Sequence, residues 1–492
     1  MHPHLLEISA WPWLERLSRR EQRRVTLGDV RAAEWDSVSD AGFDLVFLMG
    51  VWRRSAIGRE MAQTDPVLRA EYDRVLPGWK PTDVPGSPYC IQAYEPDERM
   101  GGWAGLDAAR DELTARGVKL ILDFVPNHTG FDHAWVTSQP QRYVLGTADD
   151  FRAAPDDFRR IESAGGPVFV ACGRDPFFAP WRDVAQLNYF NPDTRGAMRG
   201  TLRDIARHCD GVRCDMAMLA LNDVFDRTWD RIMRGAWPRP AGEFWPEATS
   251  EVASLTYLAE VYWDLEETLL AQGFDYAYDK RLLDALHTPD AGRLRGLLAA
   301  DRPEPARLAR FLENHDEPRS VAALEPRLRA SATLLGTLPG LRFFYDGQMS
   351  GRRTKAPVQL GRWPDEPEQA AIIDLYDRVL DTTRDDLFHS GNWSMLPVSP
   401  AGDGSFHNLI AFRWRMGDRL AVVVVNVTSW SAQGHVRLDG DCGLDDVDAN
   451  TYVFEDRLTG ARYPWTRSAL ADTGLYVRLD GGDAHLMVVT RA

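Results

Sequence analysis

The most regular feature of the chain is a series of short apolar runs separated by longer stretches with helical periodicity. Eight such runs occur in the first 350 residues, and most are rich in β-branched and other large apolar residues. They span Leu5 to Trp11, Asp44 to Met49, Lys119 to Phe124, Gly211 to Met216, Thr256 to Tyr262, Phe274 to Asp279, Leu308 to Glu313, and Leu341 to Tyr345. Runs of this kind separated by helices indicate parallel strands. Eight strand–helix units predict an α/β fold, a (β/α)8 barrel, rather than an open doubly wound sheet.

Two connections are too long for ordinary loops between a strand and the following helix. The first spans residues 51–88 and is rich in Arg, Pro and Gly, and the second follows the third apolar run. Connections of such length usually have structure of their own or serve a function. We therefore predict an inserted subdomain over residues 129–187. Loops after the carboxyl ends of barrel strands build the active face, so both connections are expected to lie there.

From about Asn392 the pattern changes to successive strands with turns and without helical stretches. Runs such as LIAFRWRM, RLAVVVVNVTS and AHLMVVT follow one another at short spacing, as in an antiparallel β-sandwich. The predicted organisation is a barrel over 1–128 and 188–390, the inserted subdomain over 129–187, and a C-terminal β-sandwich over 391–492. The acidic stretch 439–448 lacks the spacing of a calcium loop and is interpreted as a solvated turn.

Composition excludes several classes of protein. The chain has 492 residues, 44% of them hydrophobic, and a formal net charge of 57 − 73 = −16. Because phosphate groups are bound by clustered Lys and Arg, nucleic acid and anionic membranes are not expected partners. No run of about 18 apolar residues occurs, and the first residues lack the pattern of a secretory leader. Five cysteines without a C-x-x-C pair argue against a disulfide framework and a zinc site, so we expect a cytoplasmic location.

Acidic residues occur at or just after the ends of four predicted strands: Asp123, Asp215, Glu260 and Asp316. The carboxyl ends of barrel strands meet at one mouth, so these side chains are expected to converge. Four carboxyls in one place are costly without compensating positive charge. Arg213, His128 and His315 are the candidates for that compensation.

Hydrolysis of a glycosidic bond needs two carboxyls of opposed protonation state. A retaining mechanism has them about 5 to 5.5 Å apart, within reach of neighbouring strands such as those of Asp215 and Glu260. We expect the guanidinium of Arg213 to keep Asp215 ionised, as a nucleophile requires. We expect the apolar and aromatic run around Glu260 to raise the pKa of that carboxyl, as a general acid requires.

Four ordered motifs resemble those of the α-amylase family of retaining glycosidases and transglycosidases, glycoside hydrolase family 13. They are Asp123-Phe-Val-Pro-Asn127-His128, Gly211-Val-Arg213-Cys-Asp215, Glu260-Val-Tyr-Trp and Asn314-His315-Asp316. Gln186-Leu187-Asn188 resembles a shorter signature at the end of the inserted subdomain, and Tyr89 resembles the tyrosine that stacks on the sugar. The resemblance covers essentially the whole chain, including the C-terminal sandwich.

The resemblance implies a role for each matching residue. Asp215 would be the nucleophile, Glu260 the acid/base, and Asp316 a third carboxylate that binds sugar hydroxyls. The other matching residues would bind or support the substrate: Tyr89 by stacking, His128, Arg213 and His315 by contacting the sugar or positioning the nucleophile, and Asp123 from beneath the site. Five tryptophans on or near loops of the same face could also stack on sugars, although each alone is more often a packing residue: Trp52, Trp103, Trp135, Trp181 and Trp263.

The function that the resemblance implies is a retaining α-glycosidase acting on α-glucans or α-glucosides through a covalent glycosyl-enzyme intermediate, in carbohydrate metabolism. A transglycosylase of the glucanotransferase, maltosyltransferase or isomerase type would use the same three carboxylates and is the alternative. A non-catalytic family member is not favoured, because such members typically lose catalytic residues and this chain keeps all three. The glucan, the linkage and the oligomeric state are not indicated by the sequence.

Two departures from the family pattern change these expectations. Met218 and Leu219 stand where calcium-dependent relatives usually have Lys and His, which removes the calcium-site histidine. With Asn127 as one remaining ligand, a structural calcium ion is not favoured and no cofactor is expected. Gly86 stands where relatives that act on disaccharide ends often have Asp, which favours longer α-glucan chains.

Overall fold

A computed structural model describes residues 1–163, 165–300, 304–438 and 450–491. Its centre is a closed barrel of parallel strands, which pair in the order β1-β15-β14-β13-β12-β11-β5-β2. These strands are β1 His4–Ser9, β2 Leu45–Met49, β5 Lys119–Phe124, β11 Gly211–Cys214, β12 Thr256–Ala259, β13 Tyr276–Tyr278, β14 Leu308–Phe311 and β15 Leu341–Tyr345. The predicted (β/α)8 barrel is therefore confirmed.

Each of the eight predicted apolar runs overlaps one barrel strand, because strands covered on both faces need apolar sequence throughout. The runs predicted for β5 and β15 match those strands residue for residue. The runs predicted for β11 and β12 extend past the strands, which end at Cys214 and Ala259. The chain leaves the sheet there, and Met216 takes a left-handed conformation with φ of 42°. Asp215 and Glu260 consequently lie just beyond the strand ends.

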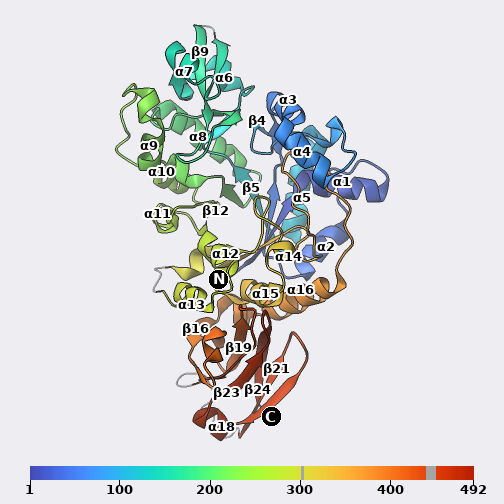
Figure 1. Cartoon of the computed structure of the whole chain (residues 1–492). Helices are drawn as coiled ribbons and strands as arrows, with labels where there is room; N and C mark the ends of the chain where they lie inside the picture. Colours follow the sequence, from blue (N-terminus) through green and yellow to red (C-terminus); the bar gives the residue numbers. More distant parts are fainter. Residues whose placement is uncertain (164, 301–303, 439–449, 492) are drawn as a thin grey trace.

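Helices surround the barrel strands (Figure 1). They are α1 Ala10–Glu21, α2 Ala32–Asp40, α5 Gly102–Ala115, α8 Pro192–Ile205, α9 Asn222–Met233, α10 Phe244–Glu251, α11 Glu266–Ala271, α12 Lys280–Leu286, α13 Ala291–Ala299, α14 Ser320–Ala323, α15 Leu328–Thr337, α16 Ala370–Thr383 and α17 Asp386–Ser390. Buried apolar residues of helices and strands form one continuous core. Within the described part of the chain, no helix has both the length and the apolar character needed to cross a membrane.

Both long connections are folded. The first contains β3 Trp52–Arg54, α3 Ala56–Thr64 and α4 Pro66–Val75, and β3 pairs antiparallel with β4 Ile91–Pro96, which follows the connection. The second forms an antiparallel sheet of β6 His128–Gly130, β7 Leu145–Gly146, β8 Phe158–Ser163, β9 Gly166–Gly173 and β10 Trp181–Gln186, with α6 Ala134–Ser138 and α7 Ala148–Ala153. Gln186 of β10 pairs with His128 of β6, so the inserted segment leaves and re-enters the barrel at one place. Figure 1 shows it at the end of the molecule opposite the C-terminal strands.

The C-terminal part is a sandwich of two antiparallel sheets around a second core. The larger sheet contains β16 Asn392–Leu396, β18 Leu409–Met416, β19 Arg419–Asn426, β24 Ala484–Arg491, β21 Thr451–Asp456 and β22 Arg462–Thr466, and the smaller one β17 Val398–Pro400, β20 Ala432–Val436 and β23 Leu475–Leu479. The expectation that no helix intervenes is wrong at α18 Arg467–Asp472, where the Thr466 hydroxyl accepts a hydrogen bond from the Ala469 N–H and caps a short helix. The acidic stretch 439–448 lies outside the described residues.

The sandwich is joined to the barrel by apolar packing. Trp414 of β18 is fully buried, and its indole N–H donates to the Thr337 carbonyl oxygen over 2.6 Å. The Arg342 guanidinium of β15 lies 5.6 Å from the centre of the Trp414 ring. Side chains of β18 and β19 belong to the same buried core as the barrel. The two parts therefore share a hydrophobic interface.

Candidate active site

The predicted acidic residues converge because neighbouring barrel strands bring them to the same edge. Arg213 of β11 lies opposite Asp123 of β5 in the strand register. Cys214 pairs with Ala259, so the residues that follow them, Asp215 and Glu260, come side by side at the carboxyl end. This is the edge where barrel enzymes carry their active residues.

One guanidinium connects these carboxyls. Arg213 Nη1 lies 2.7 Å from Asp215 Oδ1, and Arg213 Nη2 lies 2.7 Å from Glu260 Oε2. Asp123 Oδ1 is 3.6 Å from the same Nη1, while the Gly50 N–H donates to Asp123 Oδ2. Arg213 has no exposed surface, so its charge acts in a medium of low dielectric constant. It fixes the positions of both candidate catalytic carboxyls.

The protonation of Asp215 differs from the sequence-based expectation. Its pKa is raised to about 8, chiefly by burial and in addition by the charge of Glu260, although Arg213 lowers it. The loss of water outweighs one guanidinium, so the expectation that Asp215 is simply ionised is wrong for the unliganded site. Asp215 Oδ1 and Glu260 Oε2 contact the two terminal nitrogens of the same guanidinium, so the charge of Glu260 acts on Asp215 at short range.

Glu260 is held by two donors, one from its own loop after β12 and one from the loop after β11. The Tyr262 hydroxyl donates to Oε1 over 2.8 Å, and the Met216 backbone N–H donates to Oε2 over 2.7 Å. The left-handed conformation of Met216 costs about 1 kcal/mol or more for a residue with a side chain. Its N–H donates to the carboxyl, so a strained backbone position is in direct contact with the candidate acid/base.

His315 lies between two carboxyls. Its Nδ1 contacts Glu7 Oε1 of β1, and its Nε2 lies 3.0 Å from Asp316 Oδ2. Burial lowers the pKa of His315, but Asp316 and Glu7 overcome this and raise it well above its usual value. For the carboxyl of Asp316 the signs are reversed. Burial raises its pKa, but the charge of His315 lowers the pKa well below its usual range. The pair is therefore an imidazolium next to an ionised carboxylate.

The remaining predicted site residues surround this cluster. Tyr89 Oη lies 2.7 Å from His315 Nε2, and the two rings are stacked with centroids 5.3 Å apart. The Arg213 guanidinium lies 5.2 Å from the centre of the Tyr89 ring. His128, at the start of β6, meets Trp181 edge-on, and burial lowers the pKa of His128 to about 4. His128 is therefore a neutral group able to donate or accept one hydrogen bond.

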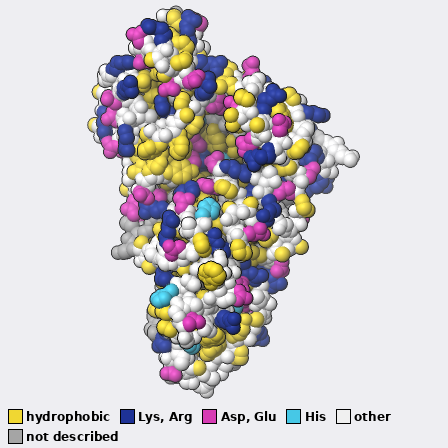
Figure 2. Space-filling view, viewed as in Figure 1, with side chains coloured by type: hydrophobic (Ala, Val, Ile, Leu, Met, Phe, Trp, Pro, Cys, Tyr) yellow, Lys and Arg dark blue, Asp and Glu magenta, His cyan; other side chains and the backbone are white. Residues whose placement is uncertain are grey.

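A cavity of about 400 Å³ lies over these residues. It is lined by Ser87, Tyr89, His128, Trp181, Asp183, Val184, Asp215, Met216, Glu260, Tyr262, Asp316 and Gln359. Five of the eight predicted site residues face it: Asp215, Glu260, Asp316, Tyr89 and His128. Arg213, His315 and Asp123 are buried behind them, which suits positioning rather than direct contact with a ligand. Figure 2 shows the molecular surface hollowed beside the inserted subdomain, with acidic side chains around the hollow.

A second hollow, of about 460 Å³, adjoins the first on the side of Glu260. Met216 and Tyr262 line both hollows. Trp263 and the exposed Phe178 add aromatic surface, and Lys280 is one of several charged residues on the wall. The arrangement leaves room for an extended molecule that passes Glu260.

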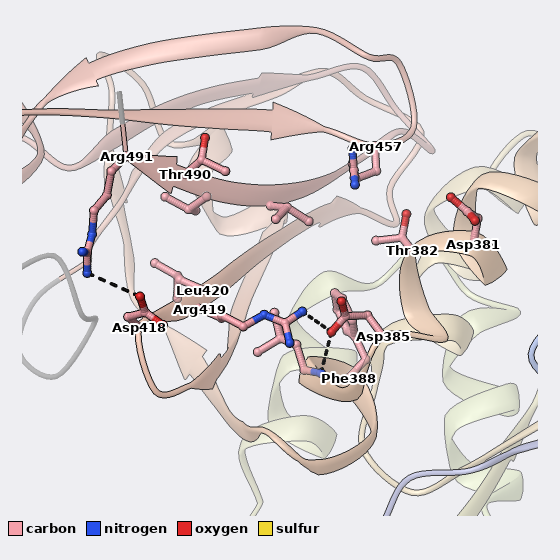
Figure 3. Close-up of a pocket in the computed structure, with 13 residues that line it drawn as sticks. Asp381, Thr382, Asp385, Phe388, Asp418, Arg419, Leu420, Arg457, Thr490 and Arg491 are labelled. Atoms are coloured by element: carbon pink, nitrogen blue, oxygen red, sulfur yellow. Dashed lines mark hydrogen bonds and ion pairs between the residues drawn. The ribbon is translucent and has the colours of Figure 1, made fainter.

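A third pocket, of about 390 Å³, is lined by residues between 381 and 491 and by none of the predicted site residues (Figure 3). It is formed where α16 and α17 meet the larger C-terminal sheet. Arg419 contacts Asp385, and Arg491 lies 3.8 Å from Asp418, so charges on its wall are neutralised within the protein. It is a groove between two structural units, and none of the predicted chemistry maps to it.

The described residues contain one group whose ligand atoms could surround a metal ion, namely His4, Asp44 and His389, within 4.8 Å of one another. It lies at the opposite end of the barrel, where β1 begins. Asp44 Oδ2 already accepts the His4 backbone N–H, and an Arg342 nitrogen lies 3.4 Å from His4 Nε2. This positive charge disfavours a cation there, so we assign no metal to the group.

Several residues at the site were not identified from the sequence as functional. Glu7 is a charged residue inside an apolar strand, and that irregularity was a usable signal. Tyr262 and Met216 lie close to recognised motifs, but only the fold shows that they contact Glu260. Asp183 and Gln359 belong to no motif and face the cavity only through tertiary structure. Of the five tryptophans considered, Trp181 and Trp263 line the hollows, whereas Trp52 is buried in the core.

Comparison with known proteins gives relatives in sequence and in fold. No family model matches the chain. The chain is 26% identical over 329 residues to α-amylase MalA of Haloarcula japonica, covering 66% of this chain and 44% of that protein. It is 28% identical over 247 residues to a trehalose synthase of Thermus thermophilus, covering 43% of this chain and 24% of that protein. The chain thus spans less than half the length of these curated relatives.

The fold has solved counterparts. An α-amylase from Lactobacillus plantarum superposes with a TM-score of 0.67 at 18% identity, covering 99% of this chain and 98% of that one. At that identity the likeness concerns the fold alone. Together with the sequence relatives, it confirms the resemblance to the α-amylase family that the four motifs indicated.

Proposed function

We propose that this chain, which resembles the α-amylase family in sequence and in fold, is a retaining glycosidase of carbohydrate metabolism. Its substrates would be α-glucans or α-glucosides, cleaved through a covalent glycosyl-enzyme intermediate. The observation that carries the proposal is a buried pair of carboxyls, Asp215 and Glu260, on neighbouring strands and bound to one guanidinium at the floor of a cavity. Retaining glycosidases need two close carboxyls that share one proton.

The first half of the reaction uses the two carboxyls in opposite states. Asp215 attacks the anomeric carbon and forms an ester, while the glycosidic C–O bond breaks. The leaving oxygen takes the proton from Glu260. We assign the proton to Glu260 because the second hollow, with room for a leaving group, adjoins Glu260. The Arg213 guanidinium, 2.7 Å from Asp215 Oδ1, favours the carboxylate form of Asp215 that attacks.

In the second half, Glu260 acts as the base. It takes a proton from water, whose oxygen attacks the anomeric carbon and releases Asp215. Asp316, which His315 keeps ionised, lies where its charge would stabilise the oxocarbenium-like transition state and bind sugar hydroxyls. Tyr89 and His128 line the same cavity and would contact the sugar.

A transglycosylase is the second candidate. It would use the same three carboxylates, with a sugar hydroxyl in place of water in the second half. The 460 Å³ hollow beside Glu260, with its aromatic wall, is the observation that favours it, because an acceptor sugar could bind there. One sequence relative is a trehalose synthase, which also suits this alternative. A non-catalytic role is not favoured, because all three carboxylates are present and face one cavity.

Two further expectations belong to this proposal. A cytoplasmic location is supported by the four described cysteines, which are all buried and unpaired. Independence from calcium is supported by Asn127, whose side-chain Oδ1 accepts a hydrogen bond from the Gln186 side-chain amide over 2.9 Å. An oxygen engaged in this way is less available to a cation.

The test is a product assay by proton NMR at early times. The protein would be incubated with maltooligosaccharides, isomaltose, sucrose, trehalose and glucose-1-phosphate. New α-anomeric reducing ends would support the retaining hydrolase, and redistributed chain lengths without new reducing ends would support the transglycosylase. Asp215→Asn should lower turnover by about 10⁴-fold or more, since it removes the nucleophile. Near-normal turnover by this variant would contradict the assignment.

A further inference from the structure

Asp183 is an acidic residue that the proposed reaction does not use, yet its side chain faces the catalytic cavity. It lies on β10 of the inserted subdomain, whereas Asp215, Glu260 and Asp316 come from the barrel. β10 pairs with β6 on one side and β9 on the other. The Cys90 thiol also donates to the Asp183 carbonyl oxygen over 3.1 Å. Asp183 itself lies where the pairing with β9 shifts register, and the Cys90 contact anchors its backbone there.

This carboxyl has no side-chain partner among the described residues. The adjacent Arg182 is directed elsewhere, since its guanidinium lies 2.7 Å from Asp156 Oδ1. Burial raises the pKa of Asp183, while its own backbone N–H opposes that shift. A half-buried carboxyl without a side-chain donor keeps part of its desolvation cost, and a folded chain usually removes that cost by pairing the group. A ligand that brings hydroxyl groups into the cavity could donate the hydrogen bonds that this carboxyl lacks.

The position of Asp183 relative to Glu260 indicates which part of a substrate it faces. The leaving group lies on the side of the general acid, next to the hollow that Trp263 and Phe178 line. Asp183 does not line that hollow. It shares the other cavity with Tyr89 and His128. If Asp215 is the nucleophile and Glu260 the acid, Asp183 faces the sugar units on the donor side of the cleaved bond.

We propose that Asp183 is a specificity-determining residue that accepts hydrogen bonds from hydroxyl groups of an α-glucan on the donor side of the site. The inference rests on the proposed function for its substrate class. It assigns to the inserted subdomain a direct part in substrate choice, through a carboxylate next to Trp181 at the entrance of β10. Because Asp183 has no protein partner to lose, its replacement should change binding without changing the stability of the fold.

The experiment measures binding separately from turnover. Asp215→Asn protein, which cannot complete the reaction, is titrated with maltotetraose by calorimetry, alone and combined with Asp183→Ala or Asp183→Asn. A hydrogen bond to a charged group is worth enough for Asp183→Ala to weaken binding by about 10- to 100-fold. Asp183→Asn should lose less, since its amide oxygen still accepts.

The matched control is Asp156→Asn in the same subdomain, where the carboxyl is exposed and pairs with Arg182. It should leave the maltotetraose affinity unchanged. The melting temperature of each variant should stay within about 2 °C of the parent, as for a change of about 0.5 kcal/mol or less in a large domain. A loss of affinity without a loss of stability supports direct contact.

The outcomes separate this inference from the proposed function. If Asp183→Ala binds maltotetraose as tightly as the parent, or if the parent does not bind it, the inference is overturned. If the affinity depends on Asp183 but the wild-type protein turns over no glucan, the inference stands and the proposed catalysis fails. If the wild-type protein cleaves glucans and Asp183→Ala cleaves them with the same kcat/KM, the catalysis stands and the inference fails.

Discussion

At the residue scale, the site consists of charges that are stable only in combination. Arg213 without its carboxyls would be an unpaired buried cation, and Asp215 and Glu260 without Arg213 would be two carboxyls in a dry site. His315 depends in the same way on Glu7 and Asp316. Removing one member therefore changes the protonation of its neighbours as well as its own contacts.

Glu7→Gln should shift the pH dependence of the reaction. Asp316 and Glu7 raise the pKa of His315 above its usual 6.5. The protonated imidazole therefore stabilises the folded site fully below about pH 6.5, and this contribution is lost as the pH rises through the raised pKa of His315. Without the Glu7 charge that loss occurs at lower pH. We expect the alkaline limb of kcat/KM to move to lower pH, with a fall of about tenfold at the wild-type optimum.

The measurement is a pH profile of kcat/KM for the wild type, Glu7→Gln and Glu7→Asp. Glu7→Asp keeps the charge and should recover part of the wild-type alkaline limb. Glu15→Gln, on helix α1 and paired with Arg99, is the control and should leave the profile unchanged. A Glu7→Gln profile of unchanged shape and reduced height would contradict the role of Glu7 in the protonation of His315.

At the element scale, the register of β11 against its neighbours decides where the carboxyls meet. Gly211 begins this strand, and a Cβ there would lie 2.5 Å from the Thr256 carbonyl oxygen of β12 and 2.5 Å from Ile121 Cδ1 of β5. Only glycine fits so close to both neighbours. The same strand carries Arg213 and leads directly into Asp215, so its position controls the site.

Gly211→Ala should therefore reduce both stability and activity. The added methyl overpacks the barrel and should lower the free energy of unfolding by about 1 to 3 kcal/mol. It should also lower kcat more than it raises KM, because the displaced strand carries the nucleophile. Urea denaturation and steady-state kinetics would measure the two effects. Gly196→Ala in α8, where a Cβ meets nothing within 4 Å, is the control and should be neutral or stabilising by up to about 1 kcal/mol.

At the scale of the whole molecule, three folded parts are combined. The barrel supplies the reacting groups, the inserted subdomain closes one wall of the cavity, and the C-terminal sandwich packs against the barrel far from the chemistry (Figure 1). The sandwich contributes no residue to the cavity among those described. Its contribution is the burial of apolar surface around Trp414.

Trp414→Ala should destabilise the protein without altering its chemistry. The ring is fully buried, and its loss should lower the free energy of unfolding by about 3 to 5 kcal/mol. The pH profile and the product pattern should stay those of the wild type below the melting transition. Trp430→Ala in the same sandwich, where the ring is 74% exposed, should change the stability by about 0.5 kcal/mol or less. Equal losses from both would contradict a shared interface at Trp414.

Removal of divalent cations should leave the protein unchanged. An ion that binds only the native state stabilises it by RT ln(1 + L/Kd), where L is the free ion concentration. A structural calcium site would therefore give a melting temperature that rises with added calcium. We expect scanning calorimetry to give the same melting temperature after dialysis against EDTA and after addition of excess calcium chloride. A clear rise with calcium would reverse the proposal that the chain is calcium-independent.

The sequence by itself determined the barrel and most of the residues at its mouth. Apolar runs such as Lys119 to Phe124 leave few alternatives to buried parallel strands, and motifs at strand ends meet because all barrel strands point the same way. Composition added an expectation about partners, since a net charge of −16 disfavours binding to nucleic acid and anionic membranes.

Only the tertiary structure decided how these residues affect one another. The protonation of Asp215 depends on its burial and on Glu260, which is 45 positions further along the chain. The expectation based on the neighbouring Arg213 alone was therefore wrong. The partnership of Glu7 with His315 joins the first strand to the loop after β14, and Asp183 meets the cavity through a separate sheet. Desolvation and long-range contacts depend on where a side chain lies in three dimensions. For Asp215, Glu7 and Asp183 no local sequence pattern specifies that position.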